Sequence, residues 1–238
     1  MASVSPSRDR SGSWGVLDAA VVLVGAQIVA LLWAGVAIGL LWSGDVPDPL
    51  TPAALVVLTI GLWAGYGLGS LLVSTRKGQG PEIEYGAVLR RSDLAPGIAL
   101  GIGTQVLLLP VLYLLIGPLV DADPGESARE LIGAVDGPLD LALILLSVVV
   151  MAPLVEELFF RGLLLQSLAR RFGDPVGIVV SAALFAAVHI EWAVMPGLFV
   201  FGIITAVITR RSGRLGLAWA MHAAFNLTTV VLIQVGWG

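Results

Sequence analysis

Residues 139–169 read LDLALILLSVVVMAPLVEELFFRGLLLQSLA. The stretch is apolar over most of its length, and it exceeds the roughly 20 residues that a helix needs to cross a hydrocarbon core. Three ionisable residues, Glu156, Glu157 and Arg161, nevertheless lie in its interior. The stretch therefore predicts a transmembrane helix that carries charged side chains at membrane depth.

The whole chain has the composition of a membrane protein. Of its 238 residues 57% are hydrophobic and 13% are charged, whereas soluble domains have about 45–50% and about 25%. We expect an all-α fold, a polytopic membrane helix bundle of about seven transmembrane helices. Residues 1–15 would form a polar cytoplasmic tail, and residues 16–238 a single membrane domain. The predicted spans are residues 16–43, 51–74, 94–120, 139–169, 175–192, 194–209 and 215–236.

The basic residues predict the orientation of the bundle. Eleven of the thirteen lie before the first span or in the loops after the second, fourth and sixth spans. Short loops rich in Arg and Lys stay in the cytoplasm. We therefore expect a multi-pass protein of the cell membrane with its N-terminus in the cytoplasm and its C-terminus outside. Trp42, Trp192 and Trp237 would lie at the outer interface. The eleven basic residues are Arg8, Arg10, Arg76, Lys77, Arg90, Arg91, Arg170, Arg171, Arg210, Arg211 and Arg214.

Two smaller patterns predict packing details. Glycines spaced four apart let helix backbones approach closely. Ser127–Val135 begins with a capping-box pattern and then places apolar residues on one face, which favours a short interfacial helix. The spaced glycines are Gly35 and Gly39, Gly61, Gly65 and Gly69, and Gly97 and Gly101.

The charged residues of the fourth span divide into a pair and a single carboxylate. Glu157 and Arg161 are four residues apart and share a helix face, so they are expected to pair. Glu156 points about 100° away from Glu157 and is expected to face another helix. A proline inside a helix removes a hydrogen bond, so Pro153 predicts a kink beside them. A buried pair alone would be compatible with a purely structural role, but Glu156 has no helical partner.

Both histidines of the chain are predicted within later membrane spans. His189 lies in the fifth span, on one face with Phe185. His222 lies in the seventh span, on one face with Asn226. Each could be a packing residue with a satisfied hydrogen bond. Together with Glu156, however, they supply the groups that activate water and stabilise an oxyanion.

The order of these motifs resembles a known family. Glu156-Glu157-x-x-x-Arg161, Phe185-x-x-x-His189 and His222-x-x-x-Asn226 resemble the CAAX-protease and bacteriocin-processing family, a group of intramembrane endopeptidases similar to type 2 CAAX prenyl proteases. The resemblance covers about residues 139–232, which would form the protease-like core.

The resemblance implies a role for each position. Glu156 would be the general base, and His189 would help to bind and polarise the attacking water. Glu157 and Arg161 would orient that site, while His222 and Asn226 would donate hydrogen bonds to the oxyanion. The implied reaction is hydrolysis of a peptide bond in a membrane-associated or prenylated substrate. The expected partners are the lipid bilayer and a peptide or lipidated protein, and no nucleic acid.

A metal site is the alternative to this metal-free reading. Glu156, His189 and His222 could bind zinc, which takes three protein ligands and a water in catalytic sites. No two histidines share a helical turn, and Asn226 beside His222 fits an oxyanion donor pair better than a metal site. We therefore favour no cofactor.

Two other function classes remain open. The polar cluster could stabilise a non-catalytic membrane scaffold or a bacteriocin-immunity protein. Glu156 and His189 could also form a proton relay in a transporter, although the ionisable residues all lie in the C-terminal half. One geometric problem also stands: if the three helices began at one level, His222 would lie about 10 Å nearer the cytoplasm than Glu156, at 1.5 Å per residue.

Overall fold

The computed structural model describes residues 13–44, 50–119 and 123–236. Most of the predicted tail, residues 1–12, lies outside the described residues, and so does Trp237. The described part of the chain contains helices and no strands, so the predicted all-α class is confirmed. The helices are α1 (Val16–Leu41), α2 (Pro52–Arg76), α3 (Pro81–Tyr85), α4 (Arg91–Gly103), η1 (Thr104–Leu108), α5 (Leu109–Ile116), η2 (Gly117–Leu119), α6 (Glu126–Gly133), α7 (Pro138–Ile144), η3 (Leu145–Met151), α8 (Ala152–Glu156), η4 (Glu157–Leu164), α9 (Leu165–Phe172), α10 (Asp174–Ala187), α11 (Met195–Ser212) and α12 (Leu215–Gln234).

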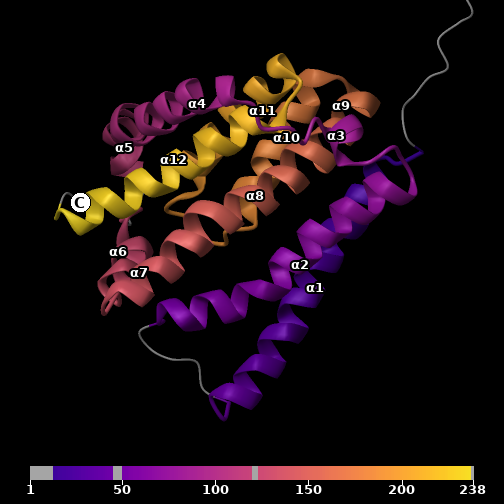
Figure 1. The fold of residues 1–238 in the computed structure, drawn as a ribbon. Coiled ribbons are helices and arrows are strands. Elements are labelled where there is room, and N and C mark those ends of the chain that lie inside the picture. Colours follow the sequence, from indigo (N-terminus) through magenta and orange to yellow (C-terminus); the bar gives the residue numbers. More distant parts are fainter. Residues whose placement is uncertain (1–12, 45–49, 120–122, 237–238) are drawn as a thin grey trace, which may run out of the picture.

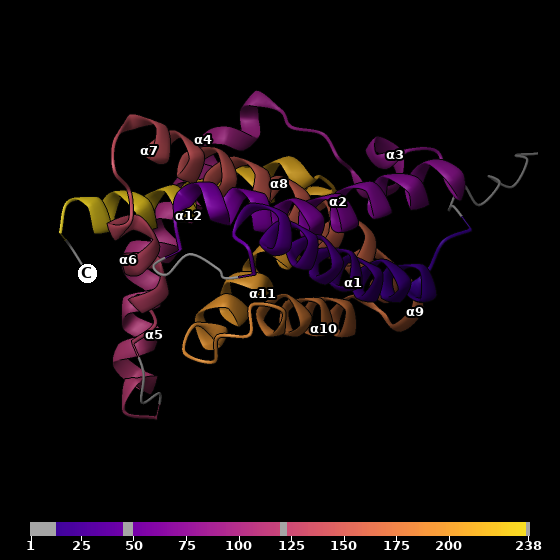
Figure 2. The ribbon, with the colours of Figure 1, turned by 90° about the horizontal axis from the view of Figure 1, so that it is seen from below.

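The bundle is organised around one long helix that runs from α7 to α9 (Figure 1). α1 and α2 form an antiparallel hairpin against it, α12 packs along α4, and α10 packs against α11. Figure 2 shows the α10–α11 pair below α1, and the long helix contacts α1 and α2 as well as α10, α11 and α12. The long helix therefore contacts elements from both halves of the chain.

Five helices of the described residues are long and apolar enough to cross a membrane. The other two predicted spans are shorter. α10 has 14 residues, or about 21 Å at 1.5 Å per residue, and α11 has 18 residues ending in Arg210, Arg211 and Ser212. The polytopic bundle is confirmed. Of the two shorter helices, α10 is shorter than the hydrocarbon thickness of about 30 Å, and α11 is close to it. The full-length helices are Val16–Leu41, Pro52–Arg76, Arg91–Ile116, Pro138–Phe172 and Leu215–Gln234.

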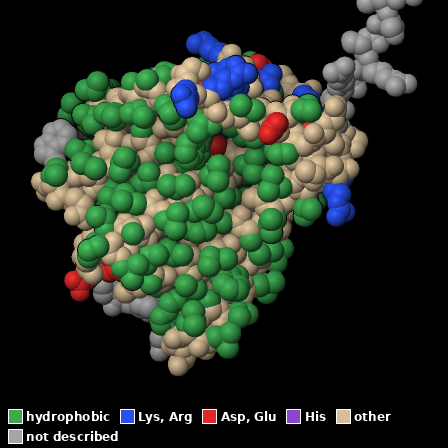
Figure 3. Space-filling view, viewed as in Figure 1, with side chains coloured by type: hydrophobic (Ala, Val, Ile, Leu, Met, Phe, Trp, Pro, Cys, Tyr) green, Lys and Arg blue, Asp and Glu red, His purple; other side chains and the backbone are tan. Residues whose placement is uncertain are grey.

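The outer surface is that of a protein in lipid. Leu17, Leu31 and Leu114 are 74% exposed or more, and hydrophobic side chains cover most of the face in Figure 3. Soluble monomers rarely expose apolar surface on this scale. Lys and Arg gather along the upper and right edges of the view and Asp and Glu at its lower left, with a few acids near the top. The chain is a multi-pass membrane protein.

The two ends of the bundle differ in charge, and we name them accordingly. The basic end holds the helix termini Arg76, Arg91, Phe172 and Ser212. The acidic end holds Leu41, Pro52, Ile116, Pro138 and Gln234, together with α6. A short helix is present there as α6, which runs from Glu126 to Gly133 and not from Ser127 to Val135. The capping box predicted at Ser127 is wrong, because the N-cap residue is Gly125 and no side chain caps the helix.

Close glycine contacts hold two helix pairs together. A Cβ on Gly65 would lie 2.5 Å from Ala26 Cα of α1, and one on Gly101 would lie 2.3 Å from the Met221 carbonyl oxygen of α12. The packing interpretation is therefore confirmed for these two motifs. For Gly35 and Gly39 the prediction of close helix packing is wrong, because a Cβ atom added to either glycine would meet nothing within 4 Å.

The start of α12 is covered by the segment between α3 and α4. The Leu215 N–H donates to the Gly86 carbonyl at 2.8 Å, and Arg214 pairs with the buried Asp93 at 2.5 Å. These contacts fix the start of α12 against the loop after α3 and the first turn of α4.

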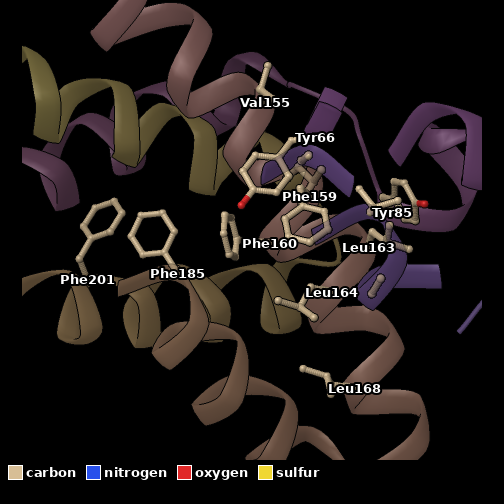
Figure 4. Packing of buried hydrophobic residues seen from close by; sticks show 14 of the residues in the cluster. Tyr66, Tyr85, Val155, Phe159, Phe160, Leu163, Leu164, Leu168, Phe185 and Phe201 are labelled. Carbon is tan, nitrogen blue, oxygen red and sulfur yellow. The ribbon is translucent and has the colours of Figure 1, made fainter. Parts of the chain in front are cut away.

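An aromatic cluster fills the bundle between the polar residues and the basic end (Figure 4). Tyr66 stacks on Phe159 with ring centroids 4.5 Å apart, Phe159 meets Phe160 at 4.9 Å, and Phe160 meets Phe185 at 5.2 Å. All four side chains are at most 1% exposed. This packing fixes the long helix against α2 and α10.

Candidate active site

The polar residues of the long helix lie where its backbone widens into π-helical turns. Ala152 N–H donates to the Ser147 carbonyl and Leu165 N–H to the Phe160 carbonyl, each five residues back. The first wide turn directly precedes Pro153, which supplies no N–H. Where the sequence predicts a kink at the proline, the structure has a widened turn, and such turns are frequent at functional sites.

Glu157 and Arg161 form the predicted buried pair. The Arg161 Nη1 lies 3.1 Å from Glu157 Oε1, and both side chains are 1% exposed. Arg161 also donates to the Thr205 hydroxyl of α11 and lies 4.3 Å from the centre of the Phe185 ring. The guanidinium is thereby tied to three helices.

Thr205 and the ring of Phe201 are site neighbours that the motifs do not include. The Thr205 hydroxyl accepts from Arg161 and in turn donates to the Phe201 carbonyl at 3.0 Å. The Phe201 ring centre lies 4.8 Å from that of His222. In the sequence, Thr205 is a polar residue inside an apolar helix. That pattern does not identify a site residue, because a threonine that only bonds to carbonyls of its own helix looks the same.

His222 lies between the two glutamates of the long helix. Its Nδ1 is 2.8 Å from Glu157 Oε1, and its Nε2 is 3.9 Å from Glu156 Oε2. A carboxylate accepts, so Nδ1 carries a proton donated to Glu157. Glu156 thus faces another helix, α12, as its angular position predicts.

This contact removes the predicted depth mismatch between His222 and Glu156. The estimate assumed that the helices start at one level. Instead the 3.9 Å distance between His222 Nε2 and Glu156 Oε2 places both side chains at one depth. The helix Pro138–Phe172 spans 35 residues, or about 52 Å, so it extends well beyond a hydrocarbon core of about 30 Å.

Four of the six candidate residues line one cavity of about 690 Å³: Glu156, His189, His222 and Asn226. Glu157 and Arg161 do not line it and lie behind its wall. The rest of the lining is mainly apolar and includes Trp63, Leu109 and Ile132. The cavity, which we call the chamber, therefore presents a small polar group to a largely apolar space.

His189 does not lie in a helix, contrary to the sequence prediction. α10 ends at Ala187, and His189 follows in a turn whose next residue, Ile190, has φ +56°. That left-handed residue redirects the chain and ends the helical pattern early. The ring still lies beside Phe185, with centroids 5.0 Å apart, and its Nδ1 is held 2.8 Å from the Phe185 carbonyl. Nε2 is the nitrogen left for other partners.

Asn226 has a partner that the motif did not reveal. Its Nδ2 donates to the Val148 carbonyl at 2.7 Å. Val148 belongs to the first π-helical segment, so the amide helps to satisfy the irregular backbone. One of the two amide protons expected to serve an oxyanion is therefore engaged in the structure.

The residues proposed for zinc do not fit a metal site. Within the described part of the chain, no group of three His, Asp or Glu side chains lies close enough to hold a metal ion. The Nδ1 of His222 is engaged by Glu157, and Nδ1 of His189 by a carbonyl. Glu157 does supply a carboxylate that orients His222, which the sequence argument against a metal did not foresee. An engaged Nδ1 leaves Nε2 free and is usual for a metal-bound histidine, so the evidence against a site is that Glu156, His189 and His222 do not form a group of three close ligands.

Comparisons with known proteins bear on the same segment. Residues 138–228 match the model of a family described as type II CAAX prenyl endopeptidase Rce1-like. An Escherichia coli protein, described as an uncharacterized 24.3 kDa protein, is 34% identical over 99 residues, which cover 40% of this chain and 45% of that relative. The chain thus aligns with less than half of the relative's length. No solved structure matches.

All six candidate residues fall inside the matched segment. The resemblance to the CAAX-protease family is confirmed for residues 138–228, the part of this membrane protein that matches the Rce1-like family model.

Proposed function

We propose that the chain is an intramembrane endopeptidase that hydrolyses a peptide bond of a membrane-associated or prenylated polypeptide. The observation that carries the proposal is the position of Glu156. It is the one ionisable residue of the long helix that faces the chamber, and it lies beside a histidine that a second glutamate orients.

In this proposal Glu156 is the general base. It takes a proton from a water in the chamber, and the water oxygen attacks the substrate carbonyl carbon. The carbonyl oxygen becomes an oxyanion. The proton then passes from Glu156 to the amide nitrogen, the C–N bond breaks, and an amine and a carboxylate leave. Such proton transfer contributes about 10²–10⁴-fold to a rate.

His189 fits the role of a water-binding residue. With the proton on Nδ1 held by the Phe185 carbonyl, its Nε2 is a free acceptor for a water proton. His189 and Glu156 line the same chamber, so they could hold one water between them.

His222 and Asn226 could still donate hydrogen bonds to the oxyanion, although one N–H of each is already bonded to another residue. His222 can donate through Nε2 only in the form in which both ring nitrogens carry a proton. Asn226 retains one amide proton beyond the one given to Val148. A single lost oxyanion donor typically costs about 10²–10³-fold in turnover.

A non-catalytic scaffold or immunity protein explains less of the site. A scaffold would account for the buried pair of Glu157 and Arg161. It gives no reason for Glu156 to face a chamber, because a carboxylate at membrane depth costs about 2.5–3.5 kcal/mol on insertion scales.

The test compares the proteins of the membrane fraction between cells carrying the wild type and cells carrying Glu156→Gln. We expect substrates to accumulate uncleaved in the variant at unchanged protein level. Glu130→Gln is the matched control, since Glu130 is an exposed glutamate outside the chamber. An identical cleavage pattern in the wild type and Glu156→Gln would contradict the proposal.

A further inference from the structure

The chamber extends from Glu156 in one direction along the bundle. On the long helix its lining runs from Ile144 to Glu156, and on α12 from His222 to Ile233. In both helices the other lining residues lie between Glu156 or His222 and the acidic end of the bundle.

The other helices repeat this pattern. α2 contributes Leu55 to Trp63, all in the half that begins at Pro52, and α4–α5 contributes Gln105 to Tyr113, toward Ile116. α2 and α4–α5 contribute no lining residue from their halves nearest the basic end. Glu156 and His222 therefore lie at the closed, inner end of the chamber.

The aromatic cluster closes the route toward the basic end. Tyr66, Phe159, Phe160 and Phe185 interlock there with at most 1% of each side chain exposed (Figure 4). A packed interior of this kind leaves no space for a polypeptide. A second cavity of about 180 Å³ does lie beyond the chamber wall, and it touches Glu157 and Trp219 but none of Glu156, His189 and His222.

The chamber reaches α6 at the acidic end. Asp123, Ala128, Arg129 and Ile132 all line it, and Arg129 forms an ion pair with Asp123. Both side chains of this pair are partly exposed, at 35% and 55%. A partly exposed ion pair, which we call the α6 rim, therefore borders the apolar chamber at this end.

We propose that substrates enter the chamber from the acidic end, and that they are extracytoplasmic segments of membrane-anchored or exported polypeptides. The inference rests on the proposed peptidase function and on the basic end being cytoplasmic, as the distribution of Arg and Lys indicates. A polypeptide in the cytoplasm would meet the closed side of the site. One whose cleavable segment lies at the outer surface would meet the α6 rim.

Thiol labelling tests the side of entry, because the chain has no cysteine of its own. Ala152→Cys places a thiol in the chamber wall one turn from Glu156. Val150→Cys is the matched control, since Val150 is exposed on the same helix but does not line the chamber. Ser127→Cys and Ser212→Cys mark the acidic and basic ends. Each full-length variant is treated with a charged, membrane-impermeant thiol reagent in intact cells and in inverted vesicles.

We expect Ala152→Cys and Ser127→Cys to react in intact cells, Ser212→Cys to react only in inverted vesicles, and Val150→Cys to stay unmodified. Reaction of Ala152→Cys only in inverted vesicles, or in neither preparation, would overturn the proposal. Exchange of the two end markers would place the acidic end in the cytoplasm and overturn the substrate class. Labelling does not require catalysis, so failure of the peptidase proposal would appear separately, as unchanged cleavage in Glu156→Gln.

Discussion

His222 contacts two consecutive glutamates, with Nδ1 at 2.8 Å from Glu157 and Nε2 at 3.9 Å from Glu156. Consecutive residues on a helix point about 100° apart, so a single ring reaches both only by lying between them. Glu157 is shielded with Arg161, whereas Glu156 faces the chamber. The two carboxylates therefore have different environments and are expected to respond differently to substitution.

Substitution of the buried pair should lower stability as well as activity. Arg161→Ala leaves Glu157 buried without its cation, and breaking a buried pair typically costs about 3–5 kcal/mol. We expect a lower yield and a lower unfolding midpoint in detergent. Glu156→Gln should keep both close to wild type while cleavage is lost, because Glu156 has no cation to strand. Equal losses of yield in the two variants would contradict this division.

The amide of Asn226 should contribute to both backbone order and rate. Asn226→Asp keeps the shape but cannot donate to the Val148 carbonyl, so two oxygens would face each other. An ordinary hydrogen bond contributes about 0.5–1.5 kcal/mol to stability. We expect the variant to lose more than this amount and to turn over substrate more slowly. Thr228→Val, which removes a hydroxyl bonded within α12, is the control on the same helix. A variant as stable and active as wild type would show that the contact has no role.

Close packing of α4 against α12 should be sensitive to one methyl group. Gly101→Ala would place a Cβ 2.3 Å from the Met221 carbonyl oxygen, forcing α12 and its His222 to move. Overpacking usually costs about 1–3 kcal/mol, and we expect activity to fall with it. Gly35→Ala, with nothing within 4 Å, should be neutral in the same thermal unfolding assay. Two equally neutral variants would argue against the observed approach of the helices.

Cleavage should not depend on a bound metal. No group of three ligands is present among the described residues, so the purified protein is expected to contain well under one zinc per chain. Activity should survive exhaustive treatment with a strong chelator, as checked by elemental analysis and cleavage assays on one sample. Stoichiometric zinc that is lost with activity and restores it on re-addition would contradict this expectation.

The sequence predicted the helices well because hydropathy reports them directly. It also predicted the Glu157–Arg161 pair, since spacing on one helix determines which side chains share a face. It did not predict the end of α10, because Val188 and Ile190 continue the apolar pattern and only the backbone of Ile190 reveals the turn.

Contacts between helices were the harder part. The Glu157–His222 and Asn226–Val148 contacts join residues 65 and 78 positions apart. They depend on how deep α12 starts relative to the long helix. No local pattern encodes that depth.

The most direct test of the account is hydrolysis by the purified full-length chain in water enriched in ¹⁸O. The protein is reconstituted in lipid vesicles with a substrate identified from the membrane-fraction comparison, and products are read by mass spectrometry. We expect one ¹⁸O atom in the new C-terminal carboxylate with the wild type and with Glu130→Gln, and no product with Glu156→Gln. Product formed by Glu156→Gln at the wild-type rate would contradict the assignment of Glu156 as the base that activates water.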